Sequence, residues 1–398
     1  MSDWDTFEAF LAEVQHEDDA KGRQDLVNAL LRQRSNWPWI HGRRATFIHH
    51  QPGTQSAALN LDTIKADPPF APMTQIDGTS LWHVTYEFEP DDLLDYLLAI
   101  DDPMTPLAGD TNIVQRVTQH WKADPLNETR MKTTQIDVSV LRMPFARPFP
   151  DWSTMQSVPR GMVMEHPLSS RQLNFSDRRL WVYRPPDYND NVEYPVLILM
   201  DALWCNGPLQ VPYIADALIK HKRMQPTIIA MVQSPPQEQK PVEMISNDRH
   251  ALFLLSELLP FVKSHYSVNP LDAGIGGVGL GAVAAAHAVL GNPAAFRRLI
   301  MISPPLTPHG AGEDPLMKYR RRFETASMLP ERIFQAVGRY ENFARFLRPG
   351  RRLAEIIQRR GDVRYRFIEH GSGHGLVAFK GIFPEALAWA YPGQEAST

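Results

Sequence analysis

The sequence predicts an α/β protein whose larger part is a mostly parallel sheet with helices on both faces, preceded by a small β-sandwich. Two observations predict this arrangement. From about residue 162, fully apolar segments of strand length alternate with helical patterns, which is typical of a parallel sheet buried on both sides. Between about residues 45 and 150, short alternating segments follow one another without helices, as in a sandwich. The length of 398 residues also favours two domains over a single core.

The chain before the parallel sheet divides into three predicted segments. Residues 1–44 form a helical segment, because apolar residues recur at helical spacing between positions 3 and 33. Residues 45–150 form the sandwich. Residues 151–169 form a linker, entered through a stretch with four prolines between positions 141 and 161. The expected strands of the sandwich are residues 45–49, 57–61, 79–88 and 94–100.

Residues 170–398 form the predicted α/β domain. Its expected strands are residues 179–184, 195–200, 227–232, 274–278, 298–302, 333–337 and 363–368. Its expected helices are residues 214–221, 250–266, 282–290, 344–360 and 384–390. Functional sites in such sheets form at the carboxyl ends of the strands. The loops that follow these strands therefore contain the main candidates.

The most informative loop joins the expected strand 274–278 to the helix 282–290. Gly277-Val278-Gly279-Leu280-Gly281 has the layout G-x-S-x-G of a nucleophile elbow, the tight turn that presents a serine above the sheet of an α/β-hydrolase. Gly279 stands in the position of the serine. Residues 270–300 contain no serine, threonine or cysteine, so no shift of register restores a nucleophile.

Two later loops contain a candidate acid and a candidate base. Esterases of the α/β-hydrolase fold present their catalytic residues in the chain order nucleophile, acid, base. Glu341 follows the strand 333–337 and fits the acid, whose role is to orient the base and stabilise its imidazolium form. His374 follows the strand 363–368 and fits the base, with His370 as its rival. The alternatives are a solvated turn glutamate and an ordinary loop histidine.

With these motifs in this order, the chain resembles the enterochelin esterase family over most of its length. The segments that carry the resemblance are GTSLWHVT at 78–85, ADPLN at 123–127, LMD at 199–201, ELLPFV at 257–262, GRYE at 338–341 and GSGH at 371–374. The resemblance implies an N-terminal β-sandwich, a C-terminal α/β-hydrolase domain, and hydrolysis of ferric catecholate siderophore esters or related esters by a Ser–His–acid triad. Glu341 and His374 match the acid and base. Gly279 departs from the serine, and Ala282 from a glycine.

The resemblance also implies an oxyanion hole near the elbow. Its backbone donors are expected at Ala202, in the loop after Asp201, and at Leu280. Trp204 in the same loop is either a stacking wall for an aromatic ligand or simple packing. Cys205 is either an ordinary small residue or a displaced nucleophile, because a thiolate attacks esters readily.

A cluster of arginines lies in the segment 304–329, which has the position of a lid over the site. The cluster is Arg320, Arg321 and Arg322. Guanidinium groups bind carboxylates and other acidic oxygens in pairs, so the cluster is either a subsite for an anionic ligand or a solvated helix face. The arginines at 348, 351 and 352 read as surface residues.

Composition excludes several classes of partner. A formal charge of −4 and a pI near 6.4 give no general attraction to nucleic acid or to an anionic membrane. The single cysteine excludes an internal disulfide, no Cys/His cluster has zinc spacing, and no segment approaches 18 uninterrupted apolar residues. We expect a soluble, cytoplasmic protein without a metal or cofactor, whose partner is a small-molecule ester or a siderophore-like ligand. The oligomeric state is left open.

Three functions fit these residues. The first, which we favour, is a catalytically impaired relative that binds a siderophore-like or acyl-ester ligand. The second is an active carboxylic-ester hydrolase in which His374 and Glu341 activate water. The third is a scaffold or interaction protein in which neither residue has a chemical role. The sequence alone does not decide whether the chain is an enzyme.

Overall fold

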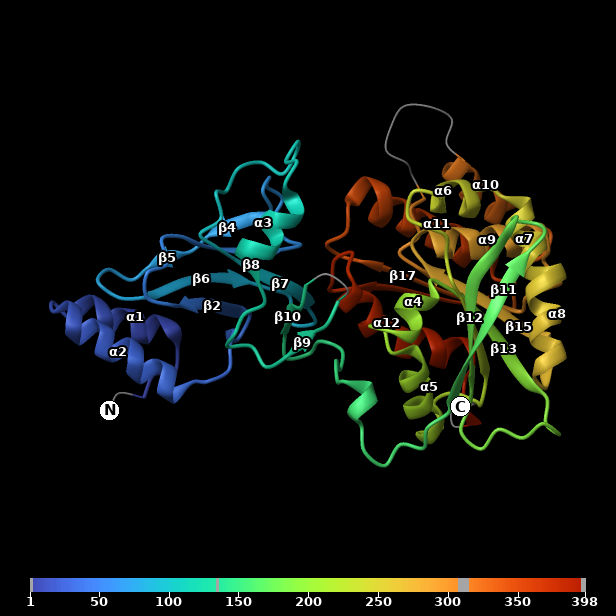
Figure 1. Ribbon diagram of the computed structural model, residues 1–398, viewed down its shortest axis with the longest axis horizontal. Helices are drawn as coiled ribbons and strands as arrows, with labels where there is room; N and C mark the ends of the chain where they lie inside the picture. Colours follow the sequence, from blue (N-terminus) through green and yellow to red (C-terminus); the bar gives the residue numbers. More distant parts are fainter. Residues whose placement is uncertain (1–2, 134–135, 307–314, 395–398) are drawn as a thin grey trace. The chain divides into compact units, whose positions relative to one another are not determined.

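The computed structural model describes residues 3–133, 136–306 and 315–394, and the chain forms two compact units (Figure 1). Unit 1 comprises Met1–Arg147 together with Gly371–Val377. Unit 2 comprises Pro148–His370 together with Ala378–Thr398. A short segment from late in the sequence therefore packs with the N-terminal unit, and this segment contains His374.

Unit 1 begins with two helices, α1 (Phe7–His16) and α2 (Ala20–Gln33), where the sequence predicts helical structure over residues 3–33. Each helix has a side-chain cap at its start: Thr6 accepts a hydrogen bond from the third residue after it, and Asp19 does the same for α2. The Asp19 cap begins a second helix, which explains why the predicted segment is divided. The buried faces of both helices pack with Trp37 into one apolar cluster.

Two antiparallel sheets follow, as the short alternating segments predict. The first sheet has the order β1 (Trp39–His41), β2 (Arg44–His50), β6 (Leu81–Glu87), β5 (Thr74–Gln75). The second has the order β4 (Phe70–Pro72), β3 (Ala57–Leu61), β7 (Leu93–Ile100), β10 (Val138–Arg142), β9 (Arg130–Met131), with β8 (Trp121–Lys122) paired to β7. Phe47 of the first sheet and Tyr96 of the second meet edge to face at 4.9 Å, so the sheets pack as a sandwich.

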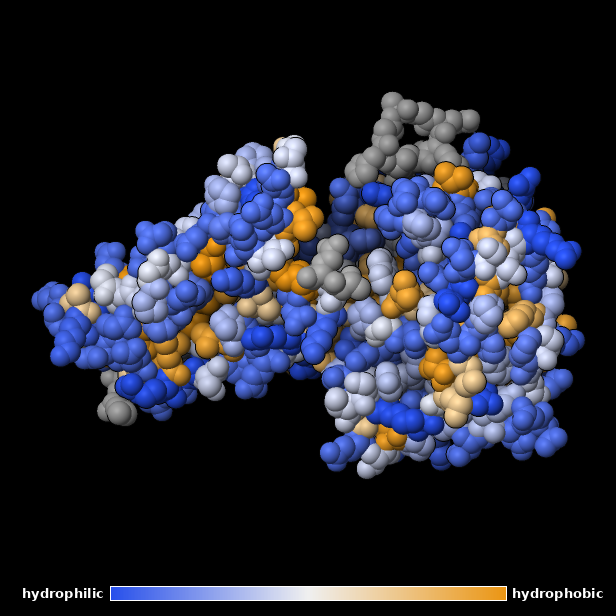
Figure 2. All heavy atoms as spheres, viewed as in Figure 1, coloured by the Kyte–Doolittle hydropathy of each residue, from blue (hydrophilic) through white to orange (hydrophobic). Residues whose placement is uncertain are grey.

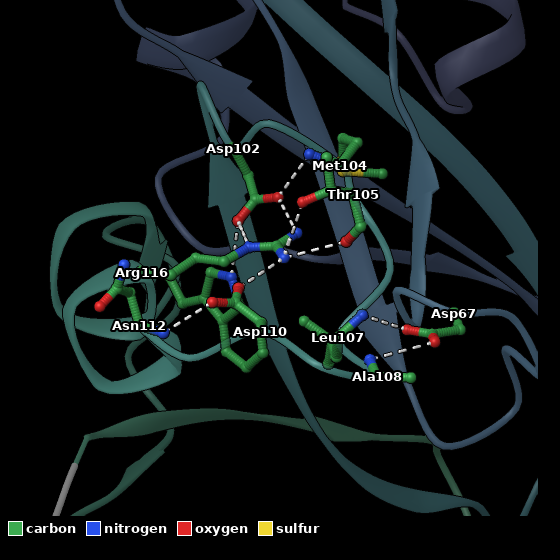
Figure 3. Close-up of polar contacts among 10 residues, drawn as sticks. Asp67, Asp102, Met104, Thr105, Leu107, Ala108, Asp110, Asn112 and Arg116 are labelled. Carbon is green, nitrogen blue, oxygen red and sulfur yellow. Dashed lines mark hydrogen bonds and ion pairs between the residues drawn. The ribbon is translucent and has the colours of Figure 1, made fainter.

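A buried ion pair orders the long loop after β7 (Figure 3). The Arg116 guanidinium donates to both carboxylate oxygens of Asp102, at 2.9 and 2.6 Å, and both side chains are almost fully buried. Arg116 also donates to the Thr105 carbonyl at 2.9 Å and to Asp110 at 3.2 Å. Arg116 lies on α3 (Ile113–His120), a helix that the sequence analysis does not predict, because its anchoring residue is charged rather than apolar.

Unit 2 contains an eight-stranded sheet with helices on both sides (Figure 1). The strand order is β11 (Met162–Ser170), β12 (Phe175–Arg184), β14 (Ile228–Val232), β13 (Tyr194–Met200), β15 (Val268–Val278), β16 (Arg298–Ile302), β17 (Arg332–Gly338), β18 (Arg364–His370). The strands from β14 to β18 in this order pair in parallel, and β11 and β12 are antiparallel. This is the predicted α/β-hydrolase fold. All seven expected strands are present, and β11 is an additional one.

All five helices predicted for unit 2 are present, two of them in altered form, and α4, α6 and α10, whose bounds are given below, were not predicted. The expected helix 250–266 is a run of α7 (Asp248–Phe253), a π-helical turn (Leu254–Leu258) and α8 (Leu259–His265). The closing helix α12 (Leu376–Ala390) begins eight residues before the predicted start at 384. The others are α4 (Ala202–Asn206), α5 (Val211–Lys220), α6 (Lys240–Met244), α9 (Leu280–Gly291), α10 (Pro315–Thr325) and α11 (Arg348–Arg360), the last preceded by a π-helical turn (Phe343–Leu347).

The surface is mostly polar on the face shown in Figure 2, where hydrophobic residues gather only in small patches. Within the described ranges, every helix is too short or too polar to cross a membrane.

Candidate active site

The elbow conformation is present although its serine is not. Gly279 lies directly between β15 and α9, with φ 55° and ψ −123°. A positive φ is strained for residues with a side chain, and nucleophile elbows hold their serine in such a strained turn. The Gly279 N–H donates to the Ile302 carbonyl of the neighbouring strand at 2.9 Å, which fixes the turn to the sheet.

The three glycines of the elbow have different surroundings. A Cβ atom on Gly277 would lie 2.6 Å from the backbone carbon of Gly281, and one on Gly281 would lie 2.9 Å from the Cβ of Met200. Both positions are too tight for any side chain. A Cβ atom on Gly279 would have no heavy atom within 4 Å among the described residues. The flanking glycines are therefore required by packing, whereas a side chain at position 279, where the motif has its serine, would enter open space.

The predicted oxyanion loop lies against the elbow. The segment is the short helix α4, whose first residue is Ala202. Asp201 is the N-cap of this helix and has a left-handed backbone (φ 61°, ψ 50°). A Cβ on Gly281 would lie 3.1 Å from the Asp201 carboxylate, so the two turns are neighbours. Ala202 and Leu280 are each the first residue of a helix, and their N–H groups have no acceptor within that helix. The sequence prediction of both as oxyanion donors stays a prediction.

An ion pair beside this loop was not anticipated from the sequence. The Lys240 ammonium group pairs with the Asp201 carboxylate and also lies 4.9 Å from the centre of the Trp204 ring. The face of an indole ring attracts a cation, so Lys240 and Trp204 stabilise each other's position. Trp204 is half-buried. Lys240 lies on α6, and a lysine on a helix gives no sequence signal for such a partner.

Cys205 does not have the properties of a displaced nucleophile. The side chain is buried, and its thiol donates to the Met200 carbonyl at 3.3 Å. Burial, with a smaller contribution from the Asp201 carboxylate, raises the pKa of the thiol well above its usual range. The thiolate, which is the attacking form, is therefore scarce at neutral pH.

Glu341, the predicted acid, is buried at the carboxyl end of the sheet, with 5% of its surface exposed. It follows β17, and one of its carboxylate oxygens accepts a hydrogen bond of 2.5 Å from the Ser303 hydroxyl. Ser303 directly follows β16, is fully buried and has a positive φ of 49°. The Ser303 hydroxyl, which lies next to the strand that pairs with the elbow strand β15, is therefore bonded to Glu341.

His374, the predicted base, is an exposed residue in a loop that packs against the sandwich of unit 1. The Leu93 N–H donates to the Gly371 carbonyl at 2.7 Å, and the Ser372 hydroxyl donates to the Leu93 carbonyl at 2.6 Å. His370 is buried at the end of β18 in unit 2. Glu341 also belongs to unit 2, so the Glu341–His374 pair stays a prediction.

Sandwich carboxylates occupy the space beside each glycine of the His374 loop. A Cβ on Gly371 would meet Asp92, one on Gly373 would overlap Asp62, and one on Gly375 would lie 3.0 Å from Asp95. Burial, and then the Asp62 carboxylate, raise the pKa of Asp95 to about 7. A side chain at Gly371 or Gly373 would force these groups to shift, and one at Gly375 would be tight. His374 is the residue between Gly373 and Gly375.

The three arginines of α10 have different environments. Arg322 bonds the His287 ring nitrogen of α9 at 2.9 Å, so it ties α10 to the helix behind the elbow. Arg321 is exposed. Arg320 lines a groove with arginines of α11. Within the described residues, no group of three or more His, Cys, Asp or Glu side chains is arranged to hold a metal ion.

Comparisons with known proteins agree with this fold. Residues 170–390 match the model of a family described as "Putative esterase". A ferric enterobactin esterase from Salmonella typhimurium is similar, with 21% identity and a TM-score of 0.75, over 91% of this chain and 98% of that chain. The enterobactin esterase of Shigella flexneri solved in the presence of enterobactin has 21% identity and a TM-score of 0.73, over 91% and 97%.

A more distant structure, the BES protein from Bacillus cereus, has 15% identity and a TM-score of 0.51, over 60% of this chain and 98% of that chain. A comparison with curated protein sequences gives no match. At these identities the solved structures show a shared fold, and the site residues are argued from their own geometry.

Proposed function

Because the chain belongs to the esterase family matched over residues 170–390, we propose that it is a member that binds an ester or siderophore-like ligand without covalent hydrolysis. One observation carries the proposal: Gly279 keeps the elbow conformation, with open space where a side chain would start, but supplies no attacking atom. An acyl-enzyme forms only when a hydroxyl or thiol attacks the ester carbonyl. This elbow has neither.

The nearest alternatives for a nucleophile have other partners. Ser303 is fully buried and its hydroxyl donates to Glu341, so substrate does not reach it. Cys205 is buried and its thiol bonds the Met200 carbonyl. Neither of these two residues therefore supports covalent catalysis in the described part of the chain.

Ligand binding is supported by what remains around the elbow. The first residues of α4 and α9, Ala202 and Leu280, offer N–H groups of the kind that hold a carbonyl oxygen. The family's solved relatives include esterases studied with enterobactin and with 2,3-dihydroxy-N-benzoyl-serine. We propose ligands of that class for this chain, with His374 and Glu341 as polar contacts.

Equilibrium binding and turnover, measured on the same preparation, test the proposal. We expect saturable calorimetric binding of 2,3-dihydroxy-N-benzoyl-serine. We also expect hydrolysis of p-nitrophenyl acetate at least about a thousandfold slower than in a Gly279→Ser variant, since loss of a triad nucleophile removes several orders of magnitude. Rapid turnover that Cys205→Ala abolishes would overturn the proposal, and absence of any ligand binding would favour the scaffold function.

A second candidate is direct hydrolysis by water, favoured by the open space above Gly279. In this reaction His374 takes a proton from water, the oxygen attacks the acyl carbon, and the alkoxide leaves with that proton. Oxyanion stabilisation and binding alone retain ~10³–10⁴-fold acceleration over water. Slow turnover that is abolished by His374→Ala, and in which hydroxylamine traps no acyl-enzyme, would distinguish this reaction from both other functions.

A further inference from the structure

A groove of about 420 Å³ lies between α10 and α11, away from the elbow glycines. It is lined by Arg320, Phe343, Arg348, Arg351, Arg352 and Glu355. These residues come from the segments that follow β16 and β17 in the chain. The sequence analysis takes the arginines of α11 for ordinary surface residues and does not predict that they gather around a cavity.

Two of the four guanidinium groups have carboxylate partners. Arg351 donates two hydrogen bonds to Glu369, at 2.7 and 2.8 Å, and this contact raises the pKa of Arg351. Arg352 donates to Glu355 at 2.9 Å. Arg320 and Arg348 have no ion-pair partner within the described ranges. The groove therefore carries uncompensated positive charge, and like charges at close range destabilise one another.

Arg320 also has a buried nitrogen without a hydrogen bond. Its Nε atom is shielded from solvent and has no partner among the described residues. Most buried polar atoms in proteins are hydrogen-bonded, so such an atom calls for an explanation. An acidic oxygen in the groove would both bond this nitrogen and neutralise the charge beside it.

The walls of the groove are fixed rather than loose. Arg360 of α11 donates to the Phe323 and Ala326 carbonyls at the end of α10, at 3.1 and 2.6 Å. At the other side, Arg322 of α10 bonds His287 of α9. These contacts hold α10 and α11 in place beside the groove.

Phe343 gives the groove an apolar surface. It is 58% exposed, which is unusual for a large aromatic residue, and it lies at the first position of the π-helical turn before α11. Flat rings pack on phenyl groups and on the planes of arginine guanidinium groups alike. The cavity volume is in the range of small-ligand sites.

We propose that this groove binds a small aromatic anion, an aryl ring that carries a carboxylate or phosphate group. Arg320 and Arg348 bind the acidic oxygens, and Phe343 packs against the ring. The proposal goes beyond the function proposed above, because binding here uses neither Gly279 nor His374. Binding in the groove can be absent while the ester binds at the elbow, and ester binding can be absent while the groove binds its ligand, so the two proposals are tested separately.

Calorimetry in a buffer free of phosphate tests it with three probes: benzoate, phenyl phosphate and inorganic phosphate. We expect saturable binding of at least one aryl probe, weakened by added salt. Arg320→Gln with Arg348→Gln should weaken it roughly tenfold or more, since each removes a hydrogen bond to a charged group. Arg359→Gln, an exposed change on the same helix, is the control and should leave affinity within about twofold.

The aromatic part has its own test. Phe343→Ala should weaken the aryl probes several-fold and leave inorganic phosphate unchanged. Equal binding of inorganic phosphate and both aryl probes, indifferent to Phe343→Ala, would overturn the aromatic preference. No saturable binding of any probe, or equal losses in Arg359→Gln and the double variant, would overturn the site. The melting temperature of each variant shows whether it is folded.

Discussion

In the elbow around Gly279 and in the loop around His374, glycines flank one predicted site residue, but the glycines are present for different reasons. In the His374 loop, a Cβ on Gly371 or Gly373 would run into a sandwich carboxylate and one on Gly375 would be tight, whereas the residue between Gly373 and Gly375 keeps its side chain. In the elbow, only Gly277 and Gly281 are crowded, and the central glycine has room. Packing therefore explains every glycine in the two segments except Gly279.

The lack of crowding at Gly279 means that packing does not explain the glycine at this position. If tight packing had forced glycine at position 279, the open space above it would be filled. Instead the turn keeps the positive φ that a serine adopts there under strain. We propose that the elbow lacks its reacting atom, whereas the His374 loop keeps the side chain at its central position. The predictions below test this contrast, from the largest expected effect to the smallest.

Gly277→Ala should cause the largest loss, because the new methyl group meets backbone that cannot rotate away. We expect the free energy of unfolding, measured by urea titration, to fall by about 3 kcal/mol or more. Gly361→Ala is the matched control: Gly361 has a positive φ of 71° and no atom near its Cβ position. It should lose only about 1 kcal/mol. Equal losses in the two variants would show that the elbow is not tightly packed.

Gly373→Ala should cause the next largest loss in the free energy of unfolding, about 2 kcal/mol, because the Asp62 side chain must move away. A double-mutant cycle measures the clash. Asp62→Ala should restore most of the stability in the Gly373→Ala background, giving a coupling of about 1 kcal/mol or more. Simple additivity of the two losses would mean that the His374 loop does not depend on this contact.

Gly279→Ser should be milder than either, with a loss of about 1–2 kcal/mol that reflects strain at positive φ and not a clash. Gly279→Ala should lose a similar amount, because the strain comes from the Cβ atom. A loss as large as that of Gly277→Ala would contradict the open space described here. The same urea titrations measure all of these variants.

Asp95 gives a predicted effect that depends on pH. Its pKa is raised from 3.8 to about 7 in the folded protein, so the folded state keeps a proton that the unfolded state loses. The stability from this proton is complete below about pH 4 and is lost as the pH rises through 7. Asp95→Asn should remove that decline, so the unfolding free energy of the variant relative to the wild type should be higher at pH 8 than at pH 5. If the unfolding free energy depended on pH in the same way in the wild type and in Asp95→Asn, this role of Asp95 would be excluded.

Sequence patterns anticipate much of unit 2 for a physical reason. Buried parallel strands are continuous apolar runs, so β13, predicted at 195–200, is found at Tyr194–Met200. β11 was missed because its residues are mostly exposed and do not form the continuous apolar run of a buried strand. In unit 1, α3 was missed because its buried anchor is Arg116, which becomes meaningful only beside Asp102.

The candidate site divides in the same way. The elbow is local, five residues with a steric rule, and its sequence predicts its conformation directly. The contacts of Glu341 with Ser303 and of the His374 loop with Leu93 join residues far apart in the chain. No single-sequence pattern encodes such partners, so the acid and base could be chosen by chain order but their hydrogen bonds could not.

The most direct test of the central claim is covalent labelling at position 279. Intact-mass spectrometry after incubation with a serine-directed fluorophosphonate should show no adduct on the wild-type protein and one adduct on Gly279→Ser. Gly279→Ala, equally strained but without a hydroxyl, should stay unlabelled, and His374→Ala in the Gly279→Ser background should slow labelling strongly. An adduct on the wild-type protein that maps to another residue would contradict the account, because a nucleophile would then exist outside the elbow. A folded Gly279→Ser protein that never labels would show that the frame around the glycine no longer supports the chemistry.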